Sequence, residues 1–83
     1  MFVVPNIEFR ALQTGKGKES GRTWYRMRFE TETGDAYSVF LEEEVAPQFF
    51  GLQRGSMIAL VCDLAFSKGN VGLRILGWQA PEE

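Results

Sequence analysis

Residues 15–30 read GKGKESGRTWYRMRFE, a glycine-rich basic loop followed by an alternating run. The second half of this stretch alternates strictly, with one parity formed by Thr23, Tyr25, Met27 and Phe29. Successive side chains of a β-strand point to opposite faces, so the alternation predicts a strand with a buried inner face. The outer parity holds Trp24, Arg26, Arg28 and Glu30. An aromatic ring and two guanidiniums in a row are unusual on an ordinary solvated face.

The segments on either side continue this two-residue period. Ile7, Phe9 and Ala11 alternate with polar residues, which predicts a first strand whose inner face carries these three side chains. Pro5 limits that strand to a sheet edge or a bulge near its start. The elements predicted for the first half are a strand over 2–12, a glycine-rich loop over 13–21, a strand over 22–32, a turn over 32–35 and a return strand over 36–41.

The alternation breaks over residues 42–55. An acidic run followed by apolar residues predicts a single helical turn there, which Pro47 keeps short. We expect its Phe and Leu side chains to plug one end of a barrel. A strand over 56–66 is apolar almost throughout, which predicts burial on most of both faces. A tight connection over 67–70, a last strand over 71–78 and a polar tail over 80–83 complete the chain.

Five strands with a short helical or irregular plug between the third and fourth predict an all-β protein. The pattern matches the partly open Greek-key barrel called the OB-fold, formed here by residues 1–83 as a single domain. An SH3-like barrel also has five strands and is the rival fold. The plug and the long first hairpin favour the OB-fold.

The composition excludes several functional classes. Cys62 is the only cysteine and histidine is absent, so neither an internal disulfide, a Cys/His zinc site nor histidine-based catalysis can form. Cys62 lies in an apolar run and is interpreted as a core residue. The glycine-rich loop does not match the Walker phosphate-binding pattern. The acidic run Glu42–Glu44 points its carboxylates in different directions and is interpreted as solvated. We therefore expect no enzyme, no metal and no cofactor.

The sequence also bears on location. No apolar run approaches the roughly 18 residues that a membrane-spanning helix needs, and the N-terminus lacks a charged segment followed by an apolar one. We expect no membrane partner and a soluble, cytoplasmic protein.

The charge of the chain is strongly asymmetric. The formal net charge is −2, yet residues 10–28 contain six basic side chains and one acid. Residues 29–83 contain three basic and nine acidic side chains. A polyanion responds to the local field, so the net charge does not exclude a nucleic-acid partner.

The candidate binding residues follow from this asymmetry. Trp24 can stack on a base while Arg26 and Arg28 pair with phosphates. Either Tyr37 or Phe40 is expected to be exposed on the return strand, and Tyr37 has the polar hydroxyl suited to the surface. Trp78 is interpreted as core or dimer interface. The candidate nucleic-acid-binding residues are Lys16, Lys18, Arg22, Trp24, Arg26, Arg28, Tyr37, Lys68 and Arg74.

Several of these motifs resemble the filamentous-phage single-stranded-DNA-binding proteins, the gene V protein family. The similar segments are Gly21-Arg22-Thr23-Trp24, the hairpin Gly34-Asp35-Ala36-Tyr37 and the second hairpin from Ser67 to Gly72. The resemblance implies a homodimer that coats single-stranded DNA cooperatively, with Arg22, Trp24 and Tyr37 at contact positions. Val71 stands where the family can have an aromatic residue, and the acidic net charge also departs from it. A similar small OB-fold protein from a conjugative element or another phage type fits nearly as well.

The resulting hypothesis is non-sequence-specific binding of single-stranded DNA, with RNA as an alternative ligand. The protein would coat and protect the strand during replication or transfer, as a homodimer or higher homo-oligomer, in the host cytoplasm if it is phage-encoded. The competing hypothesis is a protein-interaction or subunit module that binds no nucleic acid.

Overall fold

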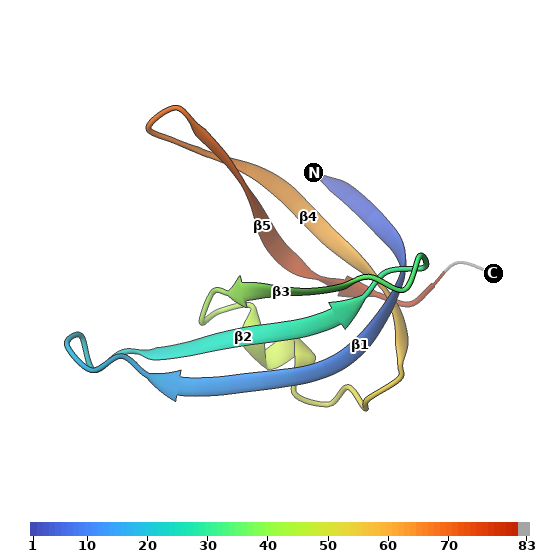
Figure 1. Ribbon diagram of the computed structural model, residues 1–83, viewed down its shortest axis with the longest axis horizontal. Coiled ribbons are helices and arrows are strands. Elements are labelled where there is room, and N and C mark those ends of the chain that lie inside the picture. Colours follow the sequence, from blue (N-terminus) through green and yellow to red (C-terminus); the bar gives the residue numbers. More distant parts are fainter. Residues whose placement is uncertain (82–83) are drawn as a thin grey trace.

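The protein is an all-β structure of five strands and one 3-10 helix, as seen in a computed structural model that describes residues 1–81 (Figure 1). The strands are β1 (Phe2–Lys16), β2 (Thr23–Glu30), β3 (Ala36–Leu41), β4 (Met57–Ser67) and β5 (Asn70–Gln79). The 3-10 helix η1 (Ala46–Phe49) lies between β3 and β4, with Pro47 in its first turn. The predicted short plug at this place is confirmed.

All neighbouring strands are antiparallel, in the order β3-β2-β1-β4-β5. β1 is long enough to pair with both halves of the sheet. Its N-terminal half pairs with β4 from Phe2 to Glu8, and its C-terminal half pairs with β2 from Glu8 to Lys16. The sheet therefore curls into a half-barrel (Figure 1), which confirms the predicted all-β, OB-like class.

Two bulges bend β1. The first is at Pro5 and Asn6, which lie between the pairs Val4–Leu60 and Ile7–Ile58; Asn6 has φ +59°. This confirms the bulge expected from Pro5. The second is at Arg10, which has no partner between the pairs Phe9–Phe29 and Ala11–Arg28. An extra residue reverses the side-chain parity beyond it. The expectation that Ala11 faces inward is therefore wrong, and Leu12 packs against the core instead.

The predicted loop over 13–21 is too long. β1 continues to Lys16, and β2 begins at Thr23, one residue later than predicted. The connection is closed by backbone hydrogen bonds from Gly17 N to Arg22 O (2.9 Å) and from Gly21 N to Gly17 O (3.0 Å). Pairing with β2 extends the strand through residues whose composition alone is typical of a loop.

The core fills the inner side of the half-barrel. Tyr25, Met27 and Phe29 of β2 point into it, as predicted from the alternation. Phe49 of η1 is 1% exposed and Leu52 packs against the same cluster, so these two side chains form the plug. Phe50 does not, because it is exposed. Cys62 is a core residue as predicted, and burial raises the pKa of its thiol.

η1 is attached to β5 across the open side of the sheet. Gln48 Nε2 donates to Leu76 O (3.2 Å), and Trp78 Nε1 donates to Gln48 O (2.6 Å). Trp78 also packs against the core, which favours the first of its two interpretations, core residue or dimer interface. Arg74 of β5 forms an ion pair with Glu42 at the end of β3 (Nε to Oε1, 2.9 Å). These contacts join the two halves of the sheet without direct pairing between β3 and β5.

The prediction of two buried faces is wrong for the distal half of β4. Ile58 to Leu60 and Cys62 are buried, but Leu64 and Phe66 are exposed. The reason is that this half pairs only with β5 in a hairpin that projects from the sheet (Figure 1). Among residues 1–81, no helix has the length and apolar character required to span a membrane.

Candidate nucleic-acid interface

The outer side of β1, β2 and β3 forms one continuous surface. Cross-strand pairs place Gln13 and Phe40 on either side of Arg26, and Ala11 and Ser38 on either side of Arg28. Residues directly opposite one another in a sheet share a face. We call this surface the outer face, and it comprises Ala11, Gln13, Gly15, Trp24, Arg26, Arg28, Ser38 and Phe40, with the pair Glu30 and Ala36 at the end away from Trp24.

Trp24 lies at one end of the outer face and is 37% exposed. Its indole lies against Gly15, the residue opposite it on β1: a Cβ atom at Gly15 would be 2.5 Å from Trp24 Cζ2. The ring also contacts Phe40 edge-on, with centroids 6.3 Å apart at 84°. Phe40 itself is 67% exposed. The two rings therefore form an exposed aromatic pair that spans β2 and β3.

Arg26 and Arg28 continue the outer face along β2. Both Arg26 Nε and Arg26 Nη2 donate to Gln13 Oε1, at 3.1 and 2.7 Å, which orients the guanidinium. Arg28 is exposed. The structure thus brings together Trp24, Arg26 and Arg28 on one face, as the alternation predicted, with Arg26 half-buried.

Tyr37 lies on the opposite side of the sheet from Trp24. It pairs across the strands with the core residue Phe29, and the two rings are 6.0 Å apart at 31°. The side chain is still exposed because β3 is an edge strand. Phe40, not Tyr37, is the aromatic residue of β3 that shares a face with Trp24.

We call the connection between β1 and β2, with Lys16, Lys18 and Arg22, the basic loop. It projects beyond the outer face at the far end of the β1–β2 hairpin (Figure 1). Lys16 is opposite Thr23, so its side chain points to the other side of the sheet from Trp24. Lys18 and Arg22 lie in the connection between the strands. All three basic side chains are exposed. Arg22 N donates to Ser20 Oγ (3.2 Å), which adds to the bonds that close the turn. These three charges are close to Trp24 in sequence and lie around its end of the hairpin.

Two candidate residues lie elsewhere. Lys68 is at the tip of the β4–β5 hairpin, which diverges from the β1–β2 hairpin (Figure 1). It has φ +48° in the turn that also contains Gly69. Arg74 is on β5 and pairs with Glu42. The structure therefore does not bring Lys68 or Arg74 to the outer face.

The charges near the outer face are not neutralised internally. In the part of the chain that the structure describes, no carboxylate oxygen lies within 4.0 Å of Lys16, Lys18, Arg22, Arg26 or Arg28. The ion pairs that do form involve the N-terminus, Arg10 and Arg74. The outer face and its adjoining loop thus combine exposed rings with unpaired positive charge.

Comparisons with known proteins were made at three levels. No family model, curated protein or solved structure matches this chain significantly. The outer face is accordingly interpreted from its own geometry.

The residues of the outer face that sequence reasoning left off the candidate list include Gln13, Gly15 and Phe40, which contact Arg26 or Trp24. Phe40 could have been assigned from the hairpin register, because pairing Glu30 with Ala36 places Phe40 opposite Arg26. Gln13 and Gly15 could not, since their parity depends on the bulge at Arg10.

Proposed function

We propose that this protein binds single-stranded DNA without strong sequence preference and without catalysing a reaction. The observation that supports this most is the outer face, where the Trp24–Phe40 pair shares one surface with two guanidiniums that have no carboxylate partner in the described part of the chain. Phe29 and Met27, on the other side of the same strand, fill the core. The buried core therefore does not include Trp24, Phe40, Arg26 or Arg28.

In the proposed complex, aromatic and basic side chains contact different parts of the nucleic acid. Nucleobases stack on Trp24 and Phe40, a contact worth about 1–3 kcal/mol per base. Arg26, Arg28 and the loop residues Lys16, Lys18 and Arg22 pair with phosphates. Stacking and phosphate pairing are common to all bases, so sequence preference is weak and RNA is an alternative ligand. The resemblance to the gene V protein family points to the same role.

The test is a titration of the full chain with oligo-dT at low salt, followed by addition of salt. We expect quenching of tryptophan fluorescence on binding and recovery as salt releases the strand. Trp24→Phe should remove the quenching, since the remaining Trp78 is hydrogen-bonded to Gln48 and packed on the core. Absence of both quenching and complex formation for the unaltered chain would contradict the proposal.

Two substitutions sharpen this test. Trp24→Ala should lower the affinity by between about 5-fold and 150-fold, the equivalent of one stacked base. Arg26→Ala should weaken binding and reduce its salt dependence. Both side chains lie outside the buried core, so circular dichroism should show an unchanged fold. Unfolding of either variant would mean that the faces of β2 are assigned wrongly.

A second candidate function, a protein-interaction module, is favoured by the β4–β5 hairpin. Its distal half carries four exposed apolar side chains on the face that continues from Cys62 and Ile75: Leu64, Phe66, Val71 and Leu73. A second copy of the chain would present the same apolar face, which is what a two-fold symmetric interface requires. We therefore propose a homodimer formed through this hairpin, which is compatible with DNA binding at the outer face.

A further inference from the structure

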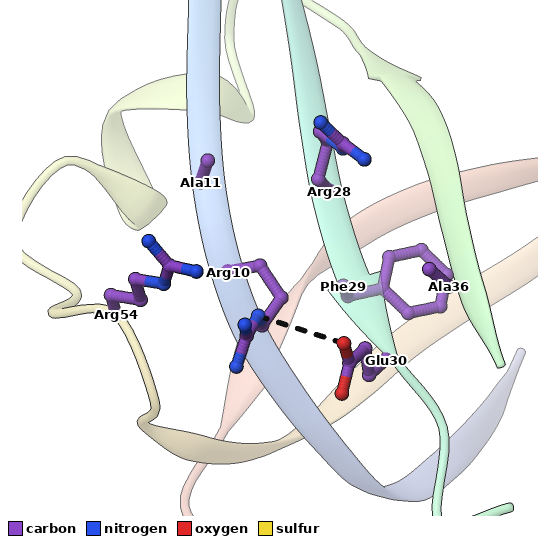
Figure 2. Close-up of a pocket in the computed structure, with 7 residues that line it drawn as sticks. All are labelled: Arg10, Ala11, Arg28, Phe29, Glu30, Ala36 and Arg54. Carbon is purple, nitrogen blue, oxygen red and sulfur yellow. Dashed lines mark ion pairs between the residues drawn. The ribbon is translucent and has the colours of Figure 1, made fainter. Parts of the chain in front are cut away.

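A hollow of about 210 Å³ lies on the outer side of the sheet, at the opposite end of β2 from Trp24 (Figure 2). Three guanidiniums from separate parts of the chain line it: Arg10 of β1, Arg28 of β2 and Arg54 of the turn before β4. Phe29, Glu30 and the small side chains Ala11 and Ala36 complete the lining. We call this the arginine pocket.

Arg54 reaches the pocket because its turn is fastened to β1. Gly55 N donates to Phe9 O (2.7 Å), and Phe9 N donates to Ser56 O (2.8 Å). Gly55 has φ +91°, a conformation that side chains other than glycine rarely adopt. The bulge follows immediately at Arg10, so the same short segment of β1 presents Arg10 and holds the turn that carries Arg54. Figure 2 shows Arg54 extending from that turn toward Arg10.

The pocket keeps a positive balance even though it contains a carboxylate. Arg10 pairs with Glu8 and with Glu30, the latter at 3.8 Å from Arg10 Nε to Glu30 Oε1. Among residues 1–81, no carboxylate oxygen lies within 4.0 Å of Arg28 or Arg54. Arg10 therefore occupies the two acids, while Arg28 and Arg54 line the same space without a carboxylate partner from these residues. Guanidiniums are suited to bidentate pairing with phosphate oxygens.

We propose that the arginine pocket binds a phosphate group of the nucleic-acid strand, through Arg28 and Arg54. This inference rests on the proposed function and extends it to Arg54, which lies far from β2 in the sequence. Trp24 and Arg28 are four residues apart on β2, or about 13 Å at the usual rise per residue. A short oligonucleotide that stacks on Trp24 and lies along β2 would reach the pocket. The pocket would then fix the position of the strand on the outer face.

The experiment compares the full chain with Arg54→Gln in oligo-dT titrations over a series of salt concentrations. One lost phosphate contact should reduce the slope of log affinity against log salt by about 0.7, which corresponds to about eightfold weaker binding at 50 mM salt. Lys68→Gln changes the net charge equally but lies outside the outer face, so it should change the slope less. Ala36→Glu, which introduces a negative charge into the lining, should weaken binding at least as much as Arg54→Gln.

Oligo-dT with a 5′-phosphate or a 5′-hydroxyl distinguishes the two sources of the phosphate. If the pocket takes a terminal monoester, the 5′-phosphorylated strand binds more tightly and Arg54→Gln removes the difference. If the pocket takes an internal phosphodiester, both strands bind the unaltered chain equally, and Arg54→Gln weakens the binding of both by the same factor. Either result supports the pocket.

Three outcomes would overturn it. Unchanged slope and affinity for Arg54→Gln and Ala36→Glu, while Trp24→Ala weakens binding, would refute the pocket and leave the proposed function standing. If Lys68→Gln loses as much affinity as Arg54→Gln, the effect comes from net charge alone and the pocket is refuted. Absence of binding by the unaltered chain would refute both proposals.

Discussion

At the scale of single residues, the position of the Trp24 indole depends on Gly15, the residue opposite it, which has no side chain. Gly15 lets the indole lie against β1 while the ring also contacts Phe40. Glycine in a strand interior often marks such a close approach. This explains why a residue with low β-propensity occurs within β1, and why the segment is mistaken for a loop when composition alone is considered.

The first prediction concerns this contact. Gly15→Ala should displace the indole, because the new Cβ would be 2.5 Å from Trp24 Cζ2 and 2.8 Å from Cε2. We expect a shift in tryptophan emission and severalfold weaker binding of oligo-dT, within the roughly 1–3 kcal/mol that one stacked base contributes. Gly72→Ala is the matched control in β5, since its Cβ would have only Ala65 O nearby, at 4.0 Å. Equal behaviour of the two variants in both assays would contradict this account of Trp24.

At the scale of elements, η1 is a small unit with a large structural role. It holds Phe49 in the core while Phe50, the next residue, points outward and contacts Tyr25 at a centroid distance of 5.9 Å. The plug was predictable as a short apolar interruption between strands. Which of its phenylalanines enters the core was not, because that depends on how η1 is attached to β5.

The second prediction compares these two neighbouring phenylalanines. Phe49→Ala should lower the free energy of unfolding by about 3–5 kcal/mol, the usual cost of removing a buried phenyl group. Phe50→Ala removes the same atoms from a side chain that is 58% exposed, so it should cost about 1 kcal/mol or less. Urea denaturation followed by circular dichroism measures both. Similar losses for the two variants would show that η1 is oriented differently.

At the scale of the whole molecule, two hairpins diverge from one curled sheet (Figure 1). The β1–β2 hairpin carries the basic loop, and the β4–β5 hairpin carries the exposed apolar face. The basic loop and the apolar hairpin face of Leu64, Phe66, Val71 and Leu73 thus lie on different arms. This arrangement allows the proposed strand binding and the proposed self-association to occur together.

The third prediction tests self-association. The unaltered chain should sediment as a dimer at micromolar concentrations, and Phe66→Ser should shift it toward monomer, because Phe66 is 74% exposed and belongs to the apolar hairpin face. Phe50→Ser is the control, since Phe50 is also exposed but lies off the hairpin. A monomeric unaltered chain, or equal effects of the two substitutions, would argue against a dimer through this hairpin.

The features that depend on local periodicity follow from the sequence alone. The two-residue period of β2 sorted Tyr25, Met27 and Phe29 from Trp24, Arg26 and Arg28, because a strand must present alternate side chains to opposite faces. The all-β class, the plug and the core position of Cys62 followed from similar local signals.

The contributions of segments distant in sequence to that surface and its pocket depend on long-range pairing. The bulge at Arg10 turns Gln13 and Gly15 outward, and two backbone hydrogen bonds with Phe9 hold the turn that brings Arg54 to the arginine pocket. Each of these depends on pairing between segments distant in sequence. A single inserted residue reverses a whole face, and local spacing does not specify where the insertion occurs.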